Sequence, residues 1–259
     1  MRIDDEQRAS FSEAGYMIVP GYLDPASLEV VRNVCDAGVS EIEQDMRARG
    51  VTEDRINVLG KKYFVLNARK SHPALLPIIF SKKAAAVCQA VTGPEAYLHN
   101  EQFVVKMTDT DTSFAWHQDS GYSVYSGGAA RHEPYLTFWI ALDDMGEENG
   151  TISVLPFRRA PSRGLMEHTW DPTVNAMVGY TGDDPGDPVN VPAGTLVAFS
   201  SFLLHRSGPN LTARPRRSYF VAYTPTLFTH EDSAKGIYSS GDPLLAGGIF
   251  QGGAAQSRP

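Results

Sequence analysis

Hydrophobic side chains recur at steps of three and four residues in the N-terminal third of the chain, which is the pattern of helices with one buried face. Asp24 is suited to cap the longest of these helices, Pro25 to occupy its first turn, and Gly50 to end it. A second, shorter helix is predicted between a cap at Ser81 and a stop at Gly93. The apolar positions of the first helix are Leu28, Val31, Cys35, Val39, Ile42 and Met46. The residues GYMIVPGYL, 15–23, predict a short strand before it.

From Arg55 onward the pattern changes to short runs of β-branched and aromatic residues bounded by glycine, proline, asparagine and aspartate. The runs are YFVLN, QFVVKM, YLTFWIALDD, TISVLP, TLVAFS and SYFVAYTPT. Because no regular helical pattern separates the later runs, we predict antiparallel sheets folded as a sandwich or barrel, mainly β with flanking α-helices. We expect one domain over residues 1–259, with a helix-rich part to about 95, a β core over about 96–228, and a frayed tail, GGIFQGGAAQSRP, at 247–259.

Two long segments of the β region, 120–134 and 157–188, contain no such run. Loops of this length inside a compact domain are usually functional lids or disordered segments. We therefore expect both segments to border a substrate site. They contain four aromatic candidates for substrate contact, although ordinary loop anchoring is the simpler reading for any one of them: Tyr122, Tyr125, Trp170 and Tyr180.

Charge and cysteine content narrow the possible partners. The formal net charge of −7 argues against nucleic acid, because phosphate binding needs clustered Lys and Arg, and the one basic cluster is RPRR at 214–217. Cys35 and Cys88 both fall in predicted helices, so neither a disulfide framework nor a Cys-based zinc site is expected. The chain opens without an apolar signal core and contains no run near the roughly 18 apolar residues of a membrane span. We expect a cytoplasmic monomer or homodimer.

Candidate chemistry begins with two of the seven histidines. His117 and Asp119 lie two residues apart, so in an extended stretch both side chains share one face and Gln118 points the other way. His205 ends the apolar run TLVAFSSFLLH, where a strand end can point into a sandwich. His99 flanks a strand and has no assigned role. The remaining histidines are expected to pack loops or lie at the surface: His72, His132, His168 and His230.

Two histidines and one carboxylate drawn from two strands make a facial triad, which holds Fe(II) on one side and leaves three positions open. Arg216 lies eleven positions after His205 and begins the next β run. If antiparallel strands are joined by the turn SGPNLTARP, its guanidinium returns beside the metal, while Arg217 faces the opposite way. A guanidinium suits bidentate capture of a carboxylate. A ferrous centre beside an arginine for a dicarboxylic acid is what a 2-oxoglutarate-dependent oxygenase needs.

Three longer stretches make the resemblance specific. They are WHQD (116–119), FWIALDDMGEENGTISVLP (138–156) and HRSGPNLTARPRR (205–217), and FSEAGYMIVPGYLDPASLEVVR (11–32) adds to them. The chain resembles the phytanoyl-CoA dioxygenase family of Fe(II)/2-oxoglutarate oxygenases from about residue 11 to about residue 226. The resemblance implies a double-stranded β-helix, or jelly roll, with helices packed on one sheet.

The resemblance also implies roles for single residues. His117, Asp119 and His205 would be the iron ligands, and Arg216 and Ser207 would bind the far carboxylate of 2-oxoglutarate. Three kinds of further candidate for the co-substrate pocket are a tryptophan that matches a family position, a polar residue on the strand before the His-x-Asp motif, and a threonine after EENG. These are Trp139, Asn100 or Gln102, and Thr151.

The implied reaction consumes O2 and 2-oxoglutarate, releases succinate and CO2, and hydroxylates an unactivated C–H bond of a small molecule. Epimerisation, desaturation and ring closure begin from the same hydrogen abstraction. Asp119 disfavours halogenation, because halogenating relatives replace this carboxylate with a small residue. We expect an enzyme that tailors a specialised metabolite. Many relatives carry Gly-Ser-His where this chain has Phe157–Arg159, so no relative's substrate is carried over.

Three alternatives remain open at this point. Zinc hydrolysis at the same residues leaves Arg216 and Ser207 unexplained. Hydroxylation of an acyl-CoA thioester is disfavoured by the acidic balance and the lack of an obvious basic patch for phosphates. A non-catalytic jelly-roll binding protein predicts no oxidation with Fe(II) and 2-oxoglutarate.

Overall fold

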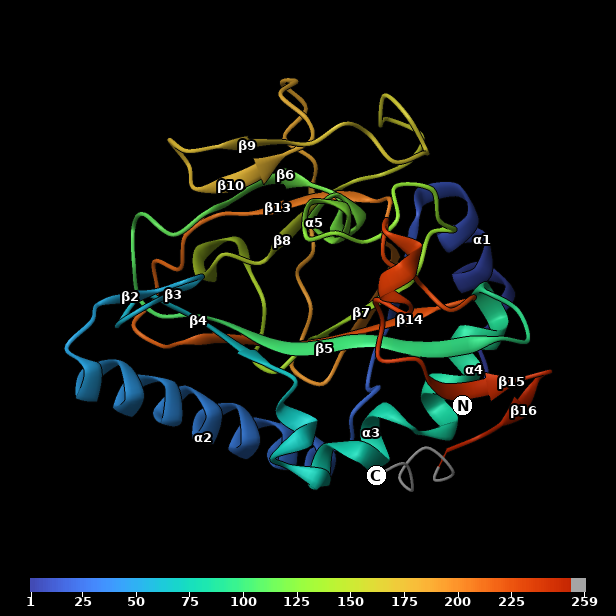
Figure 1. The fold of residues 1–259 in the computed structure, drawn as a ribbon, viewed down its shortest axis with the longest axis horizontal. Coiled ribbons are helices and arrows are strands. Elements are labelled where there is room, and N and C mark those ends of the chain that lie inside the picture. Colours follow the sequence, from blue (N-terminus) through green and yellow to red (C-terminus); the bar gives the residue numbers. More distant parts are fainter. Residues whose placement is uncertain (253–259) are drawn as a thin grey trace.

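The computed structural model describes residues 1–252 and shows two facing antiparallel sheets, with helices packed on the outer face of the larger one (Figure 1). The larger sheet has the order β1-β12-β7-β14-β5-β4-β3-β2, and β15 and β16 extend it beside β5. The smaller sheet has the order β11-β8-β13-β6, and β9 and β10 form a separate hairpin. This architecture is the double-stranded β-helix, and it confirms the predicted fold class.

The strand bounds of the larger sheet are β1 (Tyr16–Val19), β2 (Glu53–Asp54), β3 (Asn57–Val58), β4 (Lys62–Leu66), β5 (Ala96–Lys106), β7 (Leu136–Ala141), β12 (Leu196–Ser200), β14 (Arg216–Thr224), β15 (Asp242–Ala246) and β16 (Ile249–Phe250). The smaller sheet contains β6 (Phe114–His117), β8 (Ile152–Leu155), β11 (Asp187–Pro188) and β13 (Leu204–Ser207), and the hairpin contains β9 (Thr169–Asp171) and β10 (Ala176–Val178).

The two predicted helices, α2 and α4, begin at the caps expected for them, whereas α1, α3 and α5 were not predicted. In α2, the Asp24 side chain accepts a hydrogen bond from the Ser27 amide, Pro25 is the first residue, and Gly50 ends the helix in the left-handed conformation. In α4, the Ser81 side chain accepts from the Ala84 amide. The α-helices are α1 (Asp5–Ala14), α2 (Pro25–Arg49), α3 (Leu76–Ile79), α4 (Lys82–Val91) and α5 (Asp119–Tyr125), and short 3-10 turns cover Ala68–Lys70, Pro73–Leu75, Glu147–Asn149 and Ser233–Lys235. Cys35 and Cys88 are buried free thiols in α2 and α4.

Strand alternation gives the larger sheet two different faces. On β14, Tyr219 and Tyr223 are buried in the main hydrophobic core under the helices. Arg217 also faces outward, as predicted, and forms ion pairs with Asp36 of α2 at 2.9 Å and with Asp143 at 2.7 Å. The intervening residues of β14 therefore face the smaller sheet, and this inner face positions the candidate site.

Two long segments predicted to be loops contain regular structure. Residues 120–125 of segment 120–134 belong to α5, and segment 157–188 contains β9, β10 and β11. The prediction of structureless loops was therefore wrong for parts of both. The reason is pairing that periodicity does not reveal: β10 pairs with β9, and β11 joins the smaller sheet through β8.

The predicted frayed tail also needs correction. Ile249 and Phe250 form β16, which pairs with β15, and β15 pairs with β5. The remainder of the predicted tail, 253–259, lies outside the described residues. Among the described helices no single one is long and apolar enough to cross a membrane; the bent pair Pro73–Ile79 and Lys82–Val91 meets the criterion by length and composition only.

Candidate metal and co-substrate site

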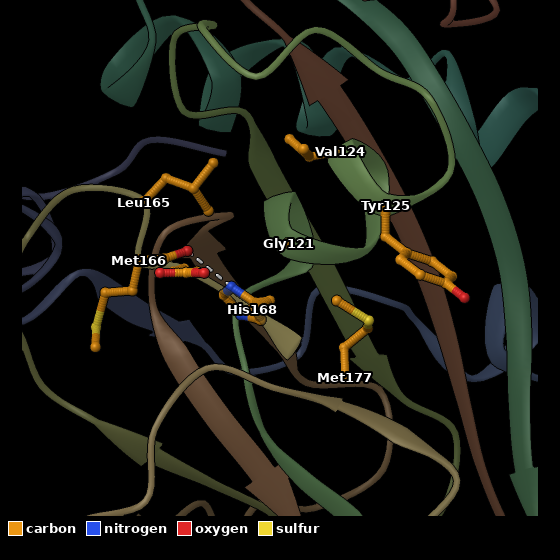
Figure 2. Close-up of a pocket in the computed structure, with 8 residues that line it drawn as sticks. Gly121, Val124, Tyr125, Leu165, Met166, His168 and Met177 are labelled. Carbon is orange, nitrogen blue, oxygen red and sulfur yellow. Dashed lines mark hydrogen bonds between the residues drawn. The ribbon is translucent and has the colours of Figure 1, made fainter. Parts of the chain in front are cut away.

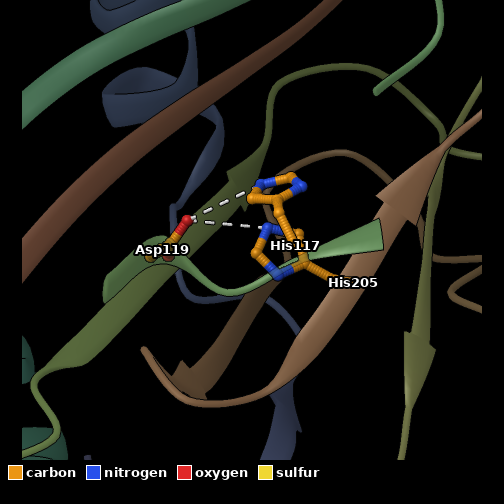
Figure 3. Close-up of side chains that lie close together, drawn as sticks. All are labelled: His117, Asp119 and His205. Carbon is orange, nitrogen blue, oxygen red and sulfur yellow. Dashed lines mark ion pairs between the residues drawn. The ribbon is translucent and has the colours of Figure 1, made fainter. Parts of the chain in front are cut away.

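The predicted metal ligands come from one strand pair and one helix start. His117 ends β6 and lies directly opposite His205 of β13, with ring centres 4.2 Å apart. The expectation that Asp119 continues the strand was wrong, because the chain turns at Gln118 and Asp119 is the first residue of α5. The side chains meet nevertheless, since the turn aims the carboxylate back at the two rings (Figure 3).

The three donor groups have the arrangement that a divalent metal requires. Asp119 Oδ1 lies 3.6 Å from His205 Nε2 and 4.0 Å from His117 Nε2. One ligand atom from each residue lies within 4.8 Å of the other two. Two imidazoles and one carboxylate on one side of a site are the donor set of a ferrous facial triad, so the residues present fit Fe(II).

Both histidines are held in the form that binds metal. His117 Nδ1 lies 2.8 Å from the Ala115 carbonyl oxygen, and His205 Nδ1 lies 3.1 Å from the Leu203 carbonyl oxygen. A carbonyl oxygen only accepts, so each Nδ1 carries the hydrogen and each Nε2 presents its lone pair toward Asp119. Backbone carbonyls thus orient both ligands.

Burial controls the protonation of the site. It lowers the pKa of His117 to about 3, with the neighbouring His205 adding to the effect, and lowers the pKa of His205 to about 4. Burial also raises the pKa of Asp119, against the opposing effects of His117 and a hydrogen bond from Thr137. Near neutral pH both imidazoles are therefore neutral, which is the form that a metal ion needs.

Thr137 is a site residue that sequence reasoning missed. It lies fully buried on β7, and its Oγ1 donates to Asp119 Oδ2 at 2.6 Å. The available signal was a threonine inside the otherwise apolar run LTFWIA, whose six residues are all buried. A buried hydroxyl needs a partner, and here the partner is the predicted carboxylate ligand.

Gln118 is structural, as predicted. It is fully buried, and its side-chain amide donates to the carbonyls of Gly164 (3.0 Å) and Phe202 (2.5 Å) and accepts from the Met166 amide (2.7 Å). Its backbone N–H donates to His168 Nε2 at 2.9 Å, so this loop histidine has the packing role expected for it. The residue between two predicted ligands therefore ties them to segment 157–188.

Arg216 begins β14 in the larger sheet, whereas His205 lies on β13 in the smaller one. The predicted pairing of these two strands in one sheet was therefore wrong. The turn between them instead crosses from one sheet to the facing one, because Asn210 within the turn ties it to β5 by donating to the Lys106 carbonyl.

Arg216 is fully buried on the inner face. Its Nε and Nη2 donate to the Gly150 carbonyl at 3.1 and 2.6 Å, and its guanidinium carbon lies 5.8 Å from the Trp139 ring centre. Burial lowers its pKa to about 10, against the opposing charge of Asp143. Arg216 stays protonated at neutral pH, so the structure buries a cation beside a predicted pocket tryptophan.

The other predicted co-substrate residues occupy different positions. Asn100 and Gln102 lie on β5 opposite Ala222 and Phe220, on the same inner face as Arg216, and Asn100 Oδ1 is buried without a hydrogen-bond partner among the described residues. Thr151 follows Gly150 and donates to the Val189 carbonyl at 2.6 Å.

Ser207 Oγ accepts a hydrogen bond from Lys106 at 2.8 Å. The co-substrate roles of all these residues stay predictions. Lys106, buried on the inner face, was missed by sequence reasoning because it reads as one cation in the strand-like run QFVVKM.

A mostly apolar pocket of about 220 Å³ lies beside the start of α5 (Figure 2). Tyr125 of α5 and Trp170 of β9, both largely exposed, stack next to it with ring centres 5.7 Å apart and planes at 12°. The lining residues are Gly121, Val124, Tyr125, Leu165, Met166, Glu167, His168 and Met177. Both long segments thus border one pocket, and its lining residue Gly121 lies two positions after Asp119 in the sequence.

Comparison with known proteins shows the family to which the chain belongs. The family model for phytanoyl-CoA dioxygenase (PhyH) matches residues 11–218. The chain belongs to the phytanoyl-CoA dioxygenase family. It is an Fe(II)/2-oxoglutarate-dependent dioxygenase, as the sequence predicts, and its cofactors are iron and 2-oxoglutarate.

A curated relative matches most of the chain in sequence, and two solved structures share its fold. Methylphosphonate hydroxylase of Gimesia maris is 24% identical over 224 residues, which cover 85% of this chain and 80% of that protein. The α-ketoglutarate-dependent carbocyclase SnoK from nogalamycin biosynthesis superposes with a TM-score of 0.66 at 20% identity, covering 94% of each chain. EvdO2 from Micromonospora carbonacea var. aurantiaca, solved with 2-oxoglutarate, gives 0.66 at 20% identity over 87% of this chain and 92% of that chain.

Proposed function

We propose that this dioxygenase oxidises an unactivated C–H bond of a free small molecule, a specialised metabolite, with hydroxylation as the default outcome. His117, Asp119 and His205 hold the iron, and Arg216 with Ser207 binds the far carboxylate of 2-oxoglutarate. The convergence of two Nε2 lone pairs on one buried carboxylate oxygen, at 3.6 and 4.0 Å, carries the proposal. The buried guanidinium of Arg216 supports it, because an uncompensated buried cation is costly unless an anion binds.

Bound iron supplies the activation of O2, which drives the decarboxylation of 2-oxoglutarate and the abstraction of a substrate hydrogen. The chain's own residues keep the site in order. The carbonyls of Ala115 and Leu203 fix the two imidazole tautomers, and Thr137 fixes one oxygen of Asp119. Asp119 also supplies a carboxylate where halogenating relatives leave room for chloride, which disfavours halogenation as an outcome.

We place the substrate at the apolar pocket beside α5. Gly121 and His168 line it, and His168 also contacts the Gln118 amide between two proposed ligands. Gly121 leaves room for the His168 ring, since a Cβ there would lie 2.5 Å from it. The pocket's apolar lining and its exposed aromatic pair suit an organic substrate with substantial carbon surface.

An anaerobic titration tests the site. Fe(II) followed by 2-oxoglutarate should produce a weak visible charge-transfer band in the wild-type protein. Arg216→Ala should raise the 2-oxoglutarate concentration needed for the band by a factor that corresponds to about 2–5 kcal/mol. His72→Gln, remote from the proposed ligands in sequence, is the control and should behave as wild type. A folded wild-type protein that shows no band would refute the assignment.

A substrate screen tests the reaction. Candidate metabolites and acyl-CoA thioesters are incubated with Fe(II), 2-oxoglutarate and O2, with succinate release and product mass as readouts. Coupled succinate release with an oxygenated, desaturated or isomerised free metabolite supports the proposal. Turnover confined to acyl-CoA thioesters would replace the proposed substrate class with the alternative one.

We further propose that one domain spanning residues 1–259 carries this activity, in the cytoplasm, as a monomer or homodimer. The two buried free thiols, Cys35 and Cys88, support a reducing compartment. Light scattering of the purified protein measures the oligomeric state, and a tetramer or larger assembly would contradict this part of the proposal.

A further inference from the structure

Lys106 is a fully buried lysine that the proposed function leaves without a role. It ends β5 and lies directly opposite Arg216 of β14 on one side and Lys62 of β4 on the other. Directly opposed residues of antiparallel strands point to the same face, so three cationic side chains form one row across the inner face. Like charges placed opposite each other destabilise a sheet, and this row therefore favours a bound anion.

The carboxylates that act on Lys106 and Arg216 are already engaged in ion pairs with other residues. Asp109, in the loop after β5, acts on Lys106, but it pairs with Lys61 at 3.4 Å. Asp143 acts on Arg216 from the outer side, but it pairs with Arg217 at 2.7 Å. Glu53 acts on Lys62 at the edge of the row, but among the described residues Lys106 and Arg216 are left without a carboxylate of their own.

The groups in direct contact with Lys106 are neutral. Its Nζ lies 4.5 Å from the Phe114 ring centre and donates hydrogen bonds only to oxygens of Ser207 and Gly208. Burial, followed by the charges of Arg216 and Lys62, keeps the pKa of Lys106 well below its usual range. The surroundings of Lys106 Nζ therefore supply no negative charge in direct contact, and a bound anion would favour the protonated form of this side chain.

The hydrogen bonds of Lys106 determine what Ser207 can do. Nζ donates to Ser207 Oγ at 2.8 Å and to the Gly208 carbonyl at 2.5 Å. When Lys106 is protonated, as a bound anion would favour, its Nζ has no lone pair, so Ser207 Oγ accepts in this bond and its own hydrogen stays free to be donated. No acceptor for that hydrogen is present among the described residues. Lys106 thereby turns Ser207 into a donor for an incoming acceptor.

Backbone contacts bring the Lys106 and Arg216 anchors together. Arg216 donates to the Gly150 carbonyl, and a Cβ on Gly150 would lie 2.5 Å from the Gly208 oxygen, which accepts from Lys106. Both cations are therefore fixed to two adjoining stretches of backbone. Ser207 also lies two residues after His205 on β13, so the same lysine supports the strand that carries a proposed iron ligand.

We propose that Lys106 is a positioning residue of the co-substrate site, which directs the Ser207 hydroxyl as a donor to the far carboxylate of 2-oxoglutarate and adds its charge to that of Arg216. The inference rests on the proposed function and deepens it. It assigns a third group to recognition of the far carboxylate, which distinguishes 2-oxoglutarate from 2-oxo acids that lack one.

The test compares two co-substrates that differ only at that end. 2-Oxoglutarate and 2-oxovalerate, in which a methyl group replaces the far carboxylate, are titrated anaerobically into the Fe(II)-loaded protein with the charge-transfer band as readout. Lys106→Met should raise the Kd for 2-oxoglutarate by about 10- to 100-fold and change the Kd for 2-oxovalerate by less than about twofold. Lys82→Met, an exposed lysine that begins α4, is the matched control and should leave both Kd values unchanged.

A merely structural role would weaken both co-substrates together, and that result overturns the proposal, as does an unchanged Kd for 2-oxoglutarate. Ser207→Ala should show the same selective loss, and the double variant should lose less than the sum of the two in free energy, because Lys106 acts through Ser207. Fully additive losses would contradict that coupling. If Lys106→Met does not fold, Lys106→Gln takes its place with the same expectations. A wild-type protein that binds neither co-substrate refutes the proposed function itself.

Discussion

Replacing Thr137 with valine would remove one hydroxyl from behind the proposed iron site. Thr137 is fully buried, and its Oγ1 donates to Asp119 Oδ2 at 2.6 Å. Valine has nearly the same shape and a β-branched side chain, so β7 should keep its backbone and packing. The change therefore isolates the support that one neighbouring residue gives to a metal ligand.

The expected magnitude follows from the burial of the carboxylate. A hydrogen bond to a charged group contributes about 1.5–3 kcal/mol, which corresponds to about 10- to 150-fold in a binding constant. Residues that orient metal ligands typically account for about 10- to 100-fold in metal affinity. The Asp119 side chain is only 12% exposed, so water replaces the lost donor poorly. We expect Thr137→Val to weaken Fe(II) binding by about 10- to 100-fold.

The assay is an anaerobic competition titration in which the protein and a chromophoric chelator share Fe(II). Thr137→Ser is the matched control, because it keeps the hydroxyl and should bind Fe(II) within about threefold of wild type. Urea unfolding of the metal-free proteins checks that both variants are folded. Equal Fe(II) affinity for the valine variant and wild type, or equal losses for serine and valine, would show that the hydrogen bond does not support the metal.

Three further predictions concern single residues. His205→Ala should abolish succinate production, and retained production would remove His205 from the iron site. Burial lowers the pKa of His99 in the folded state to about 4, from an ordinary 6.5, so the folded protein is stabilised above pH 6.5 and loses this stability as the pH falls. His99→Phe should therefore reduce the loss in unfolding free energy between pH 7 and pH 4.5 by about 2–3 kcal/mol, measured by urea unfolding. An unchanged loss would contradict the burial argument. Gly150→Ala should destabilise the protein by about 2 kcal/mol or more in the same assay, because its Cβ would lie 2.5 Å from the Gly208 oxygen at a positive φ. Gly60→Ala, also at positive φ but in open space, is the control and should destabilise the protein by only about 1 kcal/mol. Equal losses for the two variants would show that the contact with Gly208 does not contribute.

Local rules were enough to predict α2, α4 and the face of β14 from which Arg217 projects. Asp24, Pro25 and Gly50 bound α2 because caps and turn residues act within a few positions. The outward direction of Arg217 followed from alternation alone. These features depend on neighbours in sequence, and so a single chain suffices to predict them.

Features that depend on distant partners were not accessible in this way. Asp119 was placed on a strand, because nothing nearby signals that the chain turns into α5 there. Thr137 contacts Asp119 at the start of α5, and Lys106 contacts Ser207 on the facing sheet, so the role of each residue depends on a partner distant in sequence. The pairing of β13 and β14 was predicted wrongly for the same reason, because the sequence of a short strand does not indicate which of two sheets it joins.

The position of Asp119 in the first turn of α5 links the proposed metal site to the apolar pocket. One side chain closes the proposed metal cage, and the same residue's backbone begins the helix whose Gly121, Val124 and Tyr125 line the apolar pocket. Metal binding would thus restrain the N-terminal turn of α5, and metal release would remove that restraint. Because the proposed ligand and the pocket-lining residues share this short helix, we expect metal binding to stabilise the pocket lining as well as the metal site.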